Sequence, residues 1–148
     1  MKNLIKNIFF ESRKRFRVGV VGYSDKKFDK KRALELIQEG FDDLVGSKKD
    51  VEIVSGLTNV GIPAIAYKEA VKRGYRTVGI ACTKAEDYEC FPCDKIVTIG
   101  DDWGDESKTF LDNIDVLLRI GGGKQSLKEV SIAKERGMKV VEFELEVE

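Results

Sequence analysis

The sequence of 148 residues contains no histidine. This absence excludes Ser-His-Asp and Cys-His nucleophile systems, imidazole acid–base chemistry and zinc sites with histidine ligands. Any catalysis would have to use carboxylates, Lys, Arg, Tyr, Ser, Cys or backbone dipoles. Cysteine is also scarce. The three cysteines are an odd number, which argues against the disulfide framework of a small secreted protein.

The sequence has no excess of charge of either sign and no long apolar run. It holds 26 basic and 26 acidic residues, so no overall positive field exists to attract a nucleic-acid backbone. No apolar stretch approaches the roughly 20 residues that span a bilayer. The N-terminal apolar segment is too short for a secretory signal and runs into Arg13 without a small-residue cleavage site. We therefore expect a cytoplasmic protein that binds neither nucleic acid nor membrane.

Short apolar runs alternate with helical patterns along the chain. Runs rich in β-branched residues predict strands at residues 17–21, 51–55, 77–81, 95–99, 116–120 and 139–143. Apolar residues at helical spacing predict helices at residues 28–44, 62–73, 106–113 and 127–136. The alternating order predicts an α/β fold, a three-layer Rossmann-like sandwich with a mainly parallel sheet of about six strands.

The length suits one domain, and we assign residues 16–148 to it because no repeat or Pro/Gly linker divides them. Residues 1–15 are predicted to be a basic amphipathic extension. One helical face of this extension could collect Leu4, Ile5, Ile8 and Phe9. We expect it to dock on its own domain or on a partner subunit, with a membrane-surface anchor as the alternative. Residues 83–94 show no clear period and predict a loop or lid.

Small polar residues and glycines follow the first two predicted strands, at the strand ends where open parallel sheets bind ligands. The first loop holds Gly22, Tyr23 and Ser24 but lacks the G-x-G-x-x-G dinucleotide fingerprint. Ser24 and Asp25 can cap the following helix or contact a ligand. The second loop can present bare backbone N–H groups to an anion or a ring, or form an ordinary turn; it contains Gly56, Thr58, Asn59 and Gly61.

The strongest candidate is the loop after the fifth predicted strand. Three consecutive glycines are costly to order, by up to about 1 kcal/mol each relative to Ala, so they suit a backbone that must approach a ligand. A helix N-terminus follows and offers unpaired N–H groups and a positive dipole end for a phosphate. A tight glycine turn without a ligand is the alternative. The spacing does not match a Walker A loop, and the candidate phosphate-binding residues are Gly121, Gly122, Gly123, Lys124, Gln125 and Ser126.

Acidic and aromatic residues offer further contacts. An acidic cluster after the fourth predicted strand can hold a ribose hydroxyl, an amine or a divalent metal; it contains Asp101, Asp102, Asp105 and Glu106. The alternative is a solvated helix entry with Asp105 as the N-cap. Trp103 and Tyr23 can stack on a base or a pterin ring, or simply pack.

The cysteines and one arginine in a predicted strand stay ambiguous. Cys90 and Cys93 have C-x-x-C spacing, with Cys82 eight residues before the first of them. Reduced, uncoordinated thiols are our expectation, and a redox pair or a metal site are the alternatives. Arg119 lies inside a predicted strand and can pair with a neighbouring acid.

The pattern Gly-Gly-x-x-Ser-x-x-Glu after a buried strand resembles the motif of the SLOG superfamily. This group includes LOG-type nucleoside-monophosphate phosphoribohydrolases, often labelled lysine decarboxylase-like, and molybdenum cofactor carrier proteins. The loops at residues 22–24 and 56–61 are also similar to loops of that group, so the resemblance covers roughly residues 16–146. It implies a Rossmann-like fold and a phosphorylated ligand.

In LOG-type enzymes the motif reads Pro-Gly-Gly-x-Gly-Thr-x-x-Glu. This chain departs from it at three positions, where Gly121 stands at the Pro, Gln125 at the third Gly and Ser126 at the Thr. Glu129 falls on the Glu that the family implicates in cleaving the N-glycosidic bond. Those enzymes also use an Arg on the preceding helix, where this chain offers only Lys108, and Arg and Lys are not interchangeable as a bidentate fork.

Without His or that Arg, the expectation moves from an enzyme towards a carrier or sensor. We expect the loop at residues 121–123 to bind a phosphorylated nucleotide-like or pterin-type small molecule. A nucleoside monophosphate or a pterin phosphate is the ligand class, and no metal or other cofactor is assigned. Two alternatives stay open: a LOG-type phosphoribohydrolase with Glu129 as the catalytic carboxylate, and a structural or signalling subunit with a vestigial pocket. Family analogy implies a homo-oligomer, dimeric or higher.

Overall fold

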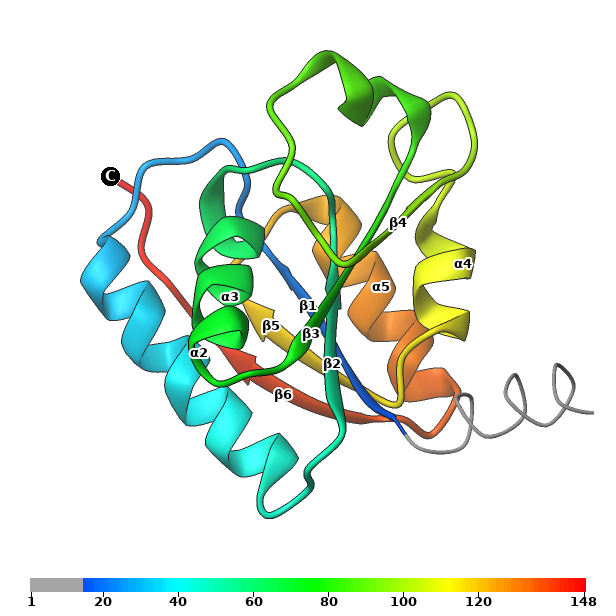
Figure 1. Cartoon of the computed structure of the whole chain (residues 1–148). Coiled ribbons are helices and arrows are strands. Elements are labelled where there is room, and N and C mark those ends of the chain that lie inside the picture. The colour runs from blue at the N-terminus through cyan, green and yellow to red at the C-terminus, as the bar shows by residue number, and fades with distance from the viewer. Residues whose placement is uncertain (1–14) are drawn as a thin grey trace, which may run out of the picture.

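The computed structural model describes residues 15–148 (Figure 1). Six strands form one sheet, in the order β4-β3-β2-β1-β5-β6. Every neighbouring pair is parallel, as the alternating sequence pattern predicts. The strands are β1 (Phe16–Gly22), β2 (Val51–Ser55), β3 (Arg76–Ala81), β4 (Lys95–Thr98), β5 (Val116–Ile120) and β6 (Lys139–Phe143).

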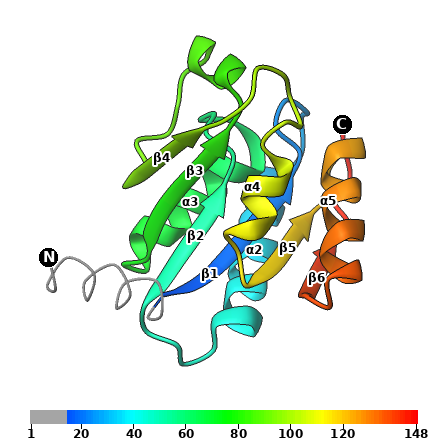
Figure 2. The same cartoon turned by 90° about the vertical axis from the view of Figure 1, so that its right-hand side faces the viewer.

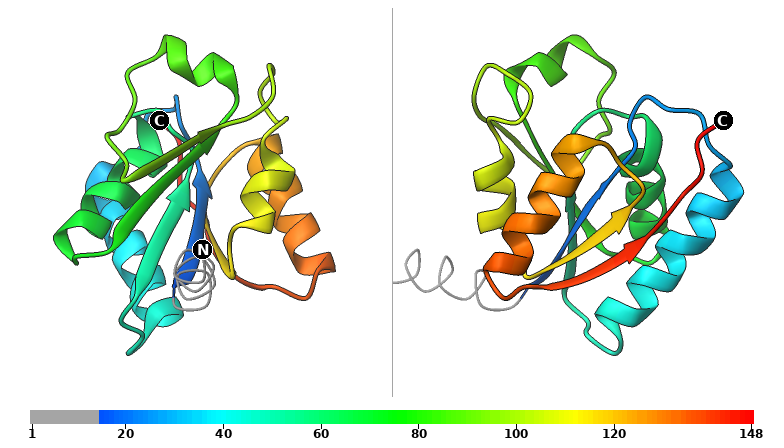
Figure 3. Two further views of the ribbon diagram at one scale, coloured as in Figure 1. Left: turned by 45° about the vertical axis from the view of Figure 1, so that its right-hand side comes forward. Right: turned by 180° about the vertical axis from the view of Figure 1, so that it is seen from behind.

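Helices cover both faces of the sheet, which confirms the three-layer sandwich. Figures 2 and 3 show α2 (Lys30–Val45) and α3 (Gly61–Lys72) on one face and α4 (Ser107–Asp112) and α5 (Lys124–Glu135) on the other. The central strands are mainly apolar because both of their faces are covered. Along β5, for example, Leu118 and Ile120 enter the core under α2 and α3, while Leu117 enters the core under α4 and α5.

The helix starts differ from the predicted ones in two informative places. Asp29 caps α2, since its Oδ1 accepts hydrogen bonds from the backbone N–H groups of Lys31 (3.0 Å) and Arg32 (3.2 Å). The capping role considered for Ser24 and Asp25 is therefore wrong. α5 begins at Lys124, three residues before the predicted start, so the glycine loop leads directly into its first turn.

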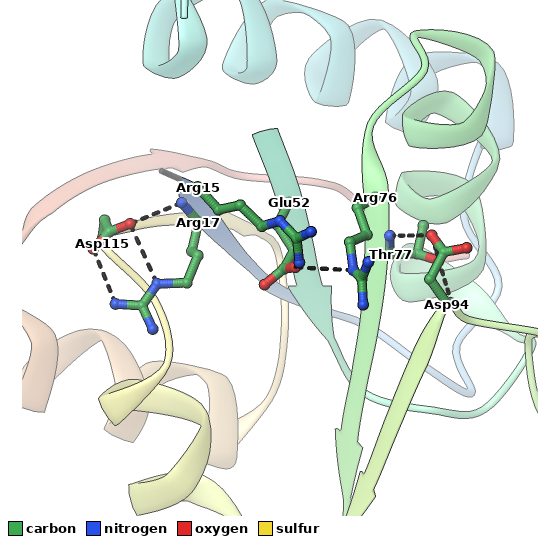
Figure 4. A network of polar contacts seen from close by, with 7 residues as sticks. All are labelled: Arg15, Arg17, Glu52, Arg76, Thr77, Asp94 and Asp115. Atoms are coloured by element: carbon green, nitrogen blue, oxygen red, sulfur yellow. Dashed lines mark hydrogen bonds and ion pairs between the residues drawn. The ribbon is translucent and has the colours of Figure 1, made fainter. Parts of the chain in front are cut away.

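The amino edge of the sheet is closed by paired charges (Figure 4). Arg17 forms a bidentate contact with Asp115, with Nη2 3.2 Å from Oδ1 and Nε 3.4 Å from Oδ2. Arg15 and Arg76 each approach Glu52 to 3.3 Å. These ion pairs neutralise Asp115 and Glu52, and the Nε of Arg76 makes an ion pair with Glu52 but no hydrogen bond.

The remaining segments complete the chain that the structure describes. Residues 83–94, predicted as a loop or lid, contain the 3-10 helix Thr83–Asp87. No helix within residues 15–148 combines the length and apolar character that crossing a bilayer requires. The predicted amphipathic extension lies outside the described residues except for Arg15, and it stays a prediction.

Candidate functional site

A cleft of about 340 Å³ opens at the carboxyl edge of the sheet. Strands β2, β3 and β4 extend from β1 on one side and β5 and β6 on the other, so the chain reverses direction across the sheet between β1 and β5. Ligands of open α/β sheets bind at this switch point. The cleft takes its walls from the segments that follow β1, β2 and β5, together with the ends of β3 and the start of α4. Its volume suits a small molecule.

Four glycines in these loops are required by close contacts or by the backbone conformation, without reference to a ligand. A Cβ on Gly22 would lie 2.3 Å from the carbonyl oxygen of Ile120, and one on Gly121 would lie 2.4 Å from the Tyr23 ring. Gly61 and Gly122 have positive φ angles, of +64° and +108°. These glycines let the three loops interlock, so their presence is explained without a ligand.

Gly56 and Gly123 are different, because a Cβ at either position would meet no atom within 4 Å. Both line the cleft, and neither has a positive φ. Nothing in the described protein fills the space beside them. These two positions are therefore where the backbone lies open to an occupant of the cleft.

The first turn of α5 carries unpaired hydrogen-bond donors into the same cleft. Gly123 is the N-cap and provides no side-chain cap, so the backbone N–H groups that begin the helix have no intrahelical partner. The first intrahelical bond runs from the Leu127 N–H to the Gly123 carbonyl, at 3.1 Å. The side chains of Lys124 and Ser126 line the cleft beside these amides. Amide donors, a hydroxyl, an ammonium group and the helix dipole together suit a phosphate.

Two buried carboxylates also line the cleft. Glu129 is only 5% exposed, and its Oε2 accepts a 2.9 Å hydrogen bond from the Ser107 hydroxyl. Glu106 is also buried; it accepts from the Gly104 N–H (2.8 Å) and from the Gln125 amide (3.3 Å). Burial raises the pKa of Glu129 to about 7; the charge of Glu106 adds to this, while hydrogen bonds from Ser107 and Gln125 oppose it. Glu129 can therefore accept or donate a proton near neutral pH.

The rest of the acidic cluster is structural. Asp105 does not cap α4: its Oδ2 accepts from the backbone N–H groups of Asp101 (3.1 Å) and Asp102 (3.0 Å), which closes the turn before the helix. Asp102 pairs with Lys84 at 2.7 Å. The described residues contain no group of three or more Cys, Asp or Glu side chains arranged to hold a metal ion. Of the four acids, the cleft includes Glu106 alone.

The structure divides the other predicted site residues into two groups. The cleft brings together residues from all three loops and both predicted ring contacts: Gly22, Tyr23, Ser24, Gly56, Thr58, Trp103, Gly123, Lys124, Gln125, Ser126 and Glu129. Asn59 and Gly61 instead line a second hollow. Lys108 is 82% exposed, pairs with Asp112 at 2.8 Å and lies outside the cleft lining. Gly121 and Gly122, also predicted to bind the phosphate, do not line the cleft; a Cβ on them would meet Tyr23 and Ser126.

Sequence reasoning placed Glu106 in a cluster and missed its pairing with Glu129. The two residues come from different helices, and only the packing of α4 against α5 brings them together. It also left Ser107 without a role. No sequence signal indicates this arrangement, because it depends on how α4 packs against α5.

The C-x-x-C segment is attached to the second loop. Thr58 and Cys90 form an isolated antiparallel bridge, and the Phe91 N–H donates to the Leu57 carbonyl at 2.9 Å. All three cysteines are free thiols in the structure. Burial raises the pKa of Cys93 to about 11, so this thiol stays protonated at neutral pH.

The buried side chain of Arg119 holds the glycine loop through a hydrogen bond to its backbone. Its Nη1 donates to the Gly121 carbonyl at 2.9 Å, and its other nitrogens pair with Glu142 and Glu144. Arg119 therefore pairs with acidic residues, as the sequence suggested. It holds the loop in place and does not line the cleft.

Tyr67 holds the second loop in a similar way, and replacing it tests how much this contact stabilises the protein. Its hydroxyl is buried and lies 2.7 Å from the Gly56 carbonyl oxygen and 2.8 Å from that of Val78. Tyr67→Phe is expected to lower the free energy of unfolding by about 1–3 kcal/mol, because buried carbonyls lose their donor. Urea unfolding measures this. Tyr88→Phe is the control, since Tyr88 is exposed; an equal loss in both variants would contradict the role given to Tyr67.

Comparison with known proteins adds to this geometry. A family model described as the SLOG cluster4 family matches residues 15–148. The molybdenum cofactor binding protein of the phototrophic bacterium Rippkaea orientalis is 24% identical, with a TM-score of 0.70 over 88% of this chain and 77% of that chain. The protein TM1055 is 26% identical, with a TM-score of 0.67 over 84% of this chain and 72% of that chain.

The molybdenum cofactor carrier protein MCP from Chlamydomonas reinhardtii has the same fold at 19% identity, with a TM-score of 0.64 over 86% of this chain and 76% of that chain. No curated protein gives a match.

Proposed function

We propose that this chain, which belongs to the SLOG cluster4 family, binds a phosphorylated nucleotide-like or pterin-type small molecule and carries or senses it. The observation that carries this proposal is the open space at Gly123 beside the uncapped first turn of α5. A phosphate placed there would accept hydrogen bonds from the backbone N–H groups and from Ser126, and would meet the Lys124 ammonium group.

The rest of the cleft suits the other parts of such a ligand. Tyr23 and Trp103 both line it, and Trp103 is 49% exposed, so an aromatic face is accessible to a planar ring. Glu106 and Glu129 supply acceptors for ring N–H groups or sugar hydroxyls. These acceptors lie next to the donors at the first turn of α5, since the Gln125 amide donates to Glu106 at 3.3 Å.

The similar structures favour the pterin-type ligand within this class. Two of them are described as molybdenum cofactor binding or carrier proteins, and that cofactor is a pterin-containing compound. Within the described residues the basic side chains that line the cleft are Lys26 and Lys124, and no arginine lines it. LOG-type enzymes use an arginine, so its absence from this lining favours binding over cleavage.

Gly123→Val tests the proposal. The backbone at Gly123 has φ −97° and ψ −157°, an extended conformation that valine adopts, and the new side chain would point into open space. The variant is therefore expected to fold normally and to lose binding by at least about 100-fold, because it occupies the phosphate position. Isothermal titration with nucleoside 5′-monophosphates and a phosphorylated pterin measures this.

Lys128→Val is the matched control, because Lys128 is exposed on α5 and lies outside the cleft lining. It should bind like the wild type. Binding by Gly123→Val at wild-type affinity would overturn the proposed phosphate position. Native mass spectrometry of the purified protein would report both a retained ligand and the homo-oligomer that we also propose.

A LOG-type phosphoribohydrolase is the second candidate, and the position of Glu129 favours it. This carboxyl lines the cleft with a pKa of about 7, so it can stabilise an oxocarbenium-like state or orient a water molecule. Release of free base from a nucleoside monophosphate, lost in Glu129→Gln, would support this activity. The absence of base release across the panel would remove it. The open cleft argues against the third alternative, a subunit with a vestigial pocket.

A further inference from the structure

A second hollow of about 500 Å³ adjoins the cleft and plays no part in the function proposed above. The two share one wall, the segment that contains Ser24, Asp25 and Lys26. The second hollow lies between the first turns of α2 and α3, which start at the same edge of the sheet (Figure 1). A molecule in the cleft could therefore continue past the Ser24 segment into this hollow.

The charge of this second hollow is mainly positive. Four lysines line it, Lys26, Lys27, Lys30 and Lys68. Within residues 15–148 none of them forms an ion pair, whereas other lysines of this chain, such as Lys84, Lys108 and Lys134, do. The opposing charges at the hollow are the side chains of Asp25 and Glu148. Four unpaired ammonium groups around one concavity leave a net attraction for an anion.

The backbone of α3 adds a smaller contribution to this preference. Gly61, Ala64 and Ile65 line the hollow from the start of α3, so the positive end of this helix dipole lies beside it. The Ile62 N–H is already bonded to the Tyr23 carbonyl, and Pro63 has no N–H. The lysine side chains are therefore the main attraction for an anion.

We infer that this lysine-lined hollow is a second anion site and takes a second phosphoryl group of a ligand that spans both cavities. The ligand class is then a phosphorylated compound with two separated anionic groups or a diphosphate bridge, longer than a simple monophosphate. The spanning ligand rests on the proposed function of the cleft. The anion site itself rests only on the residues of the second hollow.

Inorganic pyrophosphate is the probe, and its binding is followed by isothermal titration and by chemical-shift changes of backbone amides. The wild type should show two sites per chain at low salt, one at α5 and one between α2 and α3. Lys30→Gln combined with Lys68→Gln should weaken the second site about tenfold, since each lysine contributes a modest screened attraction. Gly123→Val should remove only the α5 site.

Lys31→Gln combined with Lys72→Gln is the matched control. It removes the same charge from exposed positions of the same two helices, but neither lysine lines the hollow. It should keep both sites. Equal weakening in both double variants, or an unchanged second site in Lys30→Gln/Lys68→Gln, would overturn the inference and leave the proposed function standing. If the wild type binds pyrophosphate between α2 and α3 but not at α5, the result contradicts the proposed function and supports the second site.

Discussion

Replacing Glu129 with glutamine is expected to stabilise the protein by about 3 kcal/mol at pH 8.5 and to leave its stability at pH 4 nearly unchanged. Burial raises the pKa of this carboxyl from its ordinary value of 4.5 to about 7. The folded state therefore holds a proton that the unfolded state releases at lower pH. Glutamine has the same shape and cannot ionise, so it removes this dependence on pH.

The direction follows from where the proton is bound. Below pH 4.5 both states carry the proton, and Glu129 does not disfavour folding. Between pH 4.5 and 7 the folded state binds more protons than the unfolded state, so the free energy of unfolding falls as the pH rises. Above pH 7 both states are ionised and the full cost of the buried charge is present. The wild type should therefore lose stability through this window, and Glu129→Gln should not.

Urea unfolding at a series of pH values measures the difference. Glu135→Gln is the control, because Glu135 is an exposed carboxylate on the same helix; it should change stability by less than about 0.5 kcal/mol at any of these pH values. A difference between Glu129→Gln and the wild type that stays constant from pH 4 to pH 8.5 would contradict the buried position of the carboxyl. Higher stability of Glu129→Gln at pH 8.5 would also mean that the wild-type carboxylate destabilises the fold. Such destabilising side chains are typical of ligand-binding and catalytic sites.

The fold could be predicted from the sequence because its main signals are local. The runs at residues 51–55 and 116–120 are mostly apolar, with Glu52, Ser55 and Arg119 as their polar residues, and this composition is typical of strands covered on both faces. The structure buries every residue of both. The motif that ends in Glu129 also placed the most suggestive loop correctly, since a glycine run between a buried strand and a helix is visible without any tertiary information.

Other features depend on tertiary packing and could not be predicted in the same way. Lys124, Gln125 and Ser126 have no apolar periodicity, so the helix was expected to begin at residue 127, yet these polar residues form its first turn. The separation of Asn59 from Thr58 is similar. Adjacent residues of one loop line different cavities, because the Tyr23–Ser24 segment passes between them.

The position of that segment depends on Gly61, and Gly61→Ala is expected to destabilise the protein by about 3 kcal/mol or more. A Cβ at Gly61 would lie 2.3 Å from the carbonyl oxygen of Tyr23 and 2.6 Å from the Cα of Ser24. Both atoms belong to backbone, so they cannot move aside as the end of a flexible side chain could. The Ile62 N–H donates to the same Tyr23 carbonyl at 2.8 Å, so displacing the segment also breaks this hydrogen bond.

Gly74→Ala separates the two causes of this loss. Gly74 also has a positive φ, of +78°, but a Cβ there would meet no atom within 4 Å. Its alanine variant should lose only the cost of the left-handed backbone, about 1 kcal/mol. Equal losses at the two positions would mean that backbone conformation alone requires Gly61. A larger loss at Gly61 would instead show that the close approach of α3 to the first loop is needed. Because Ser24 belongs to the wall that both cavities share, ligand binding at each should then weaken together in Gly61→Ala.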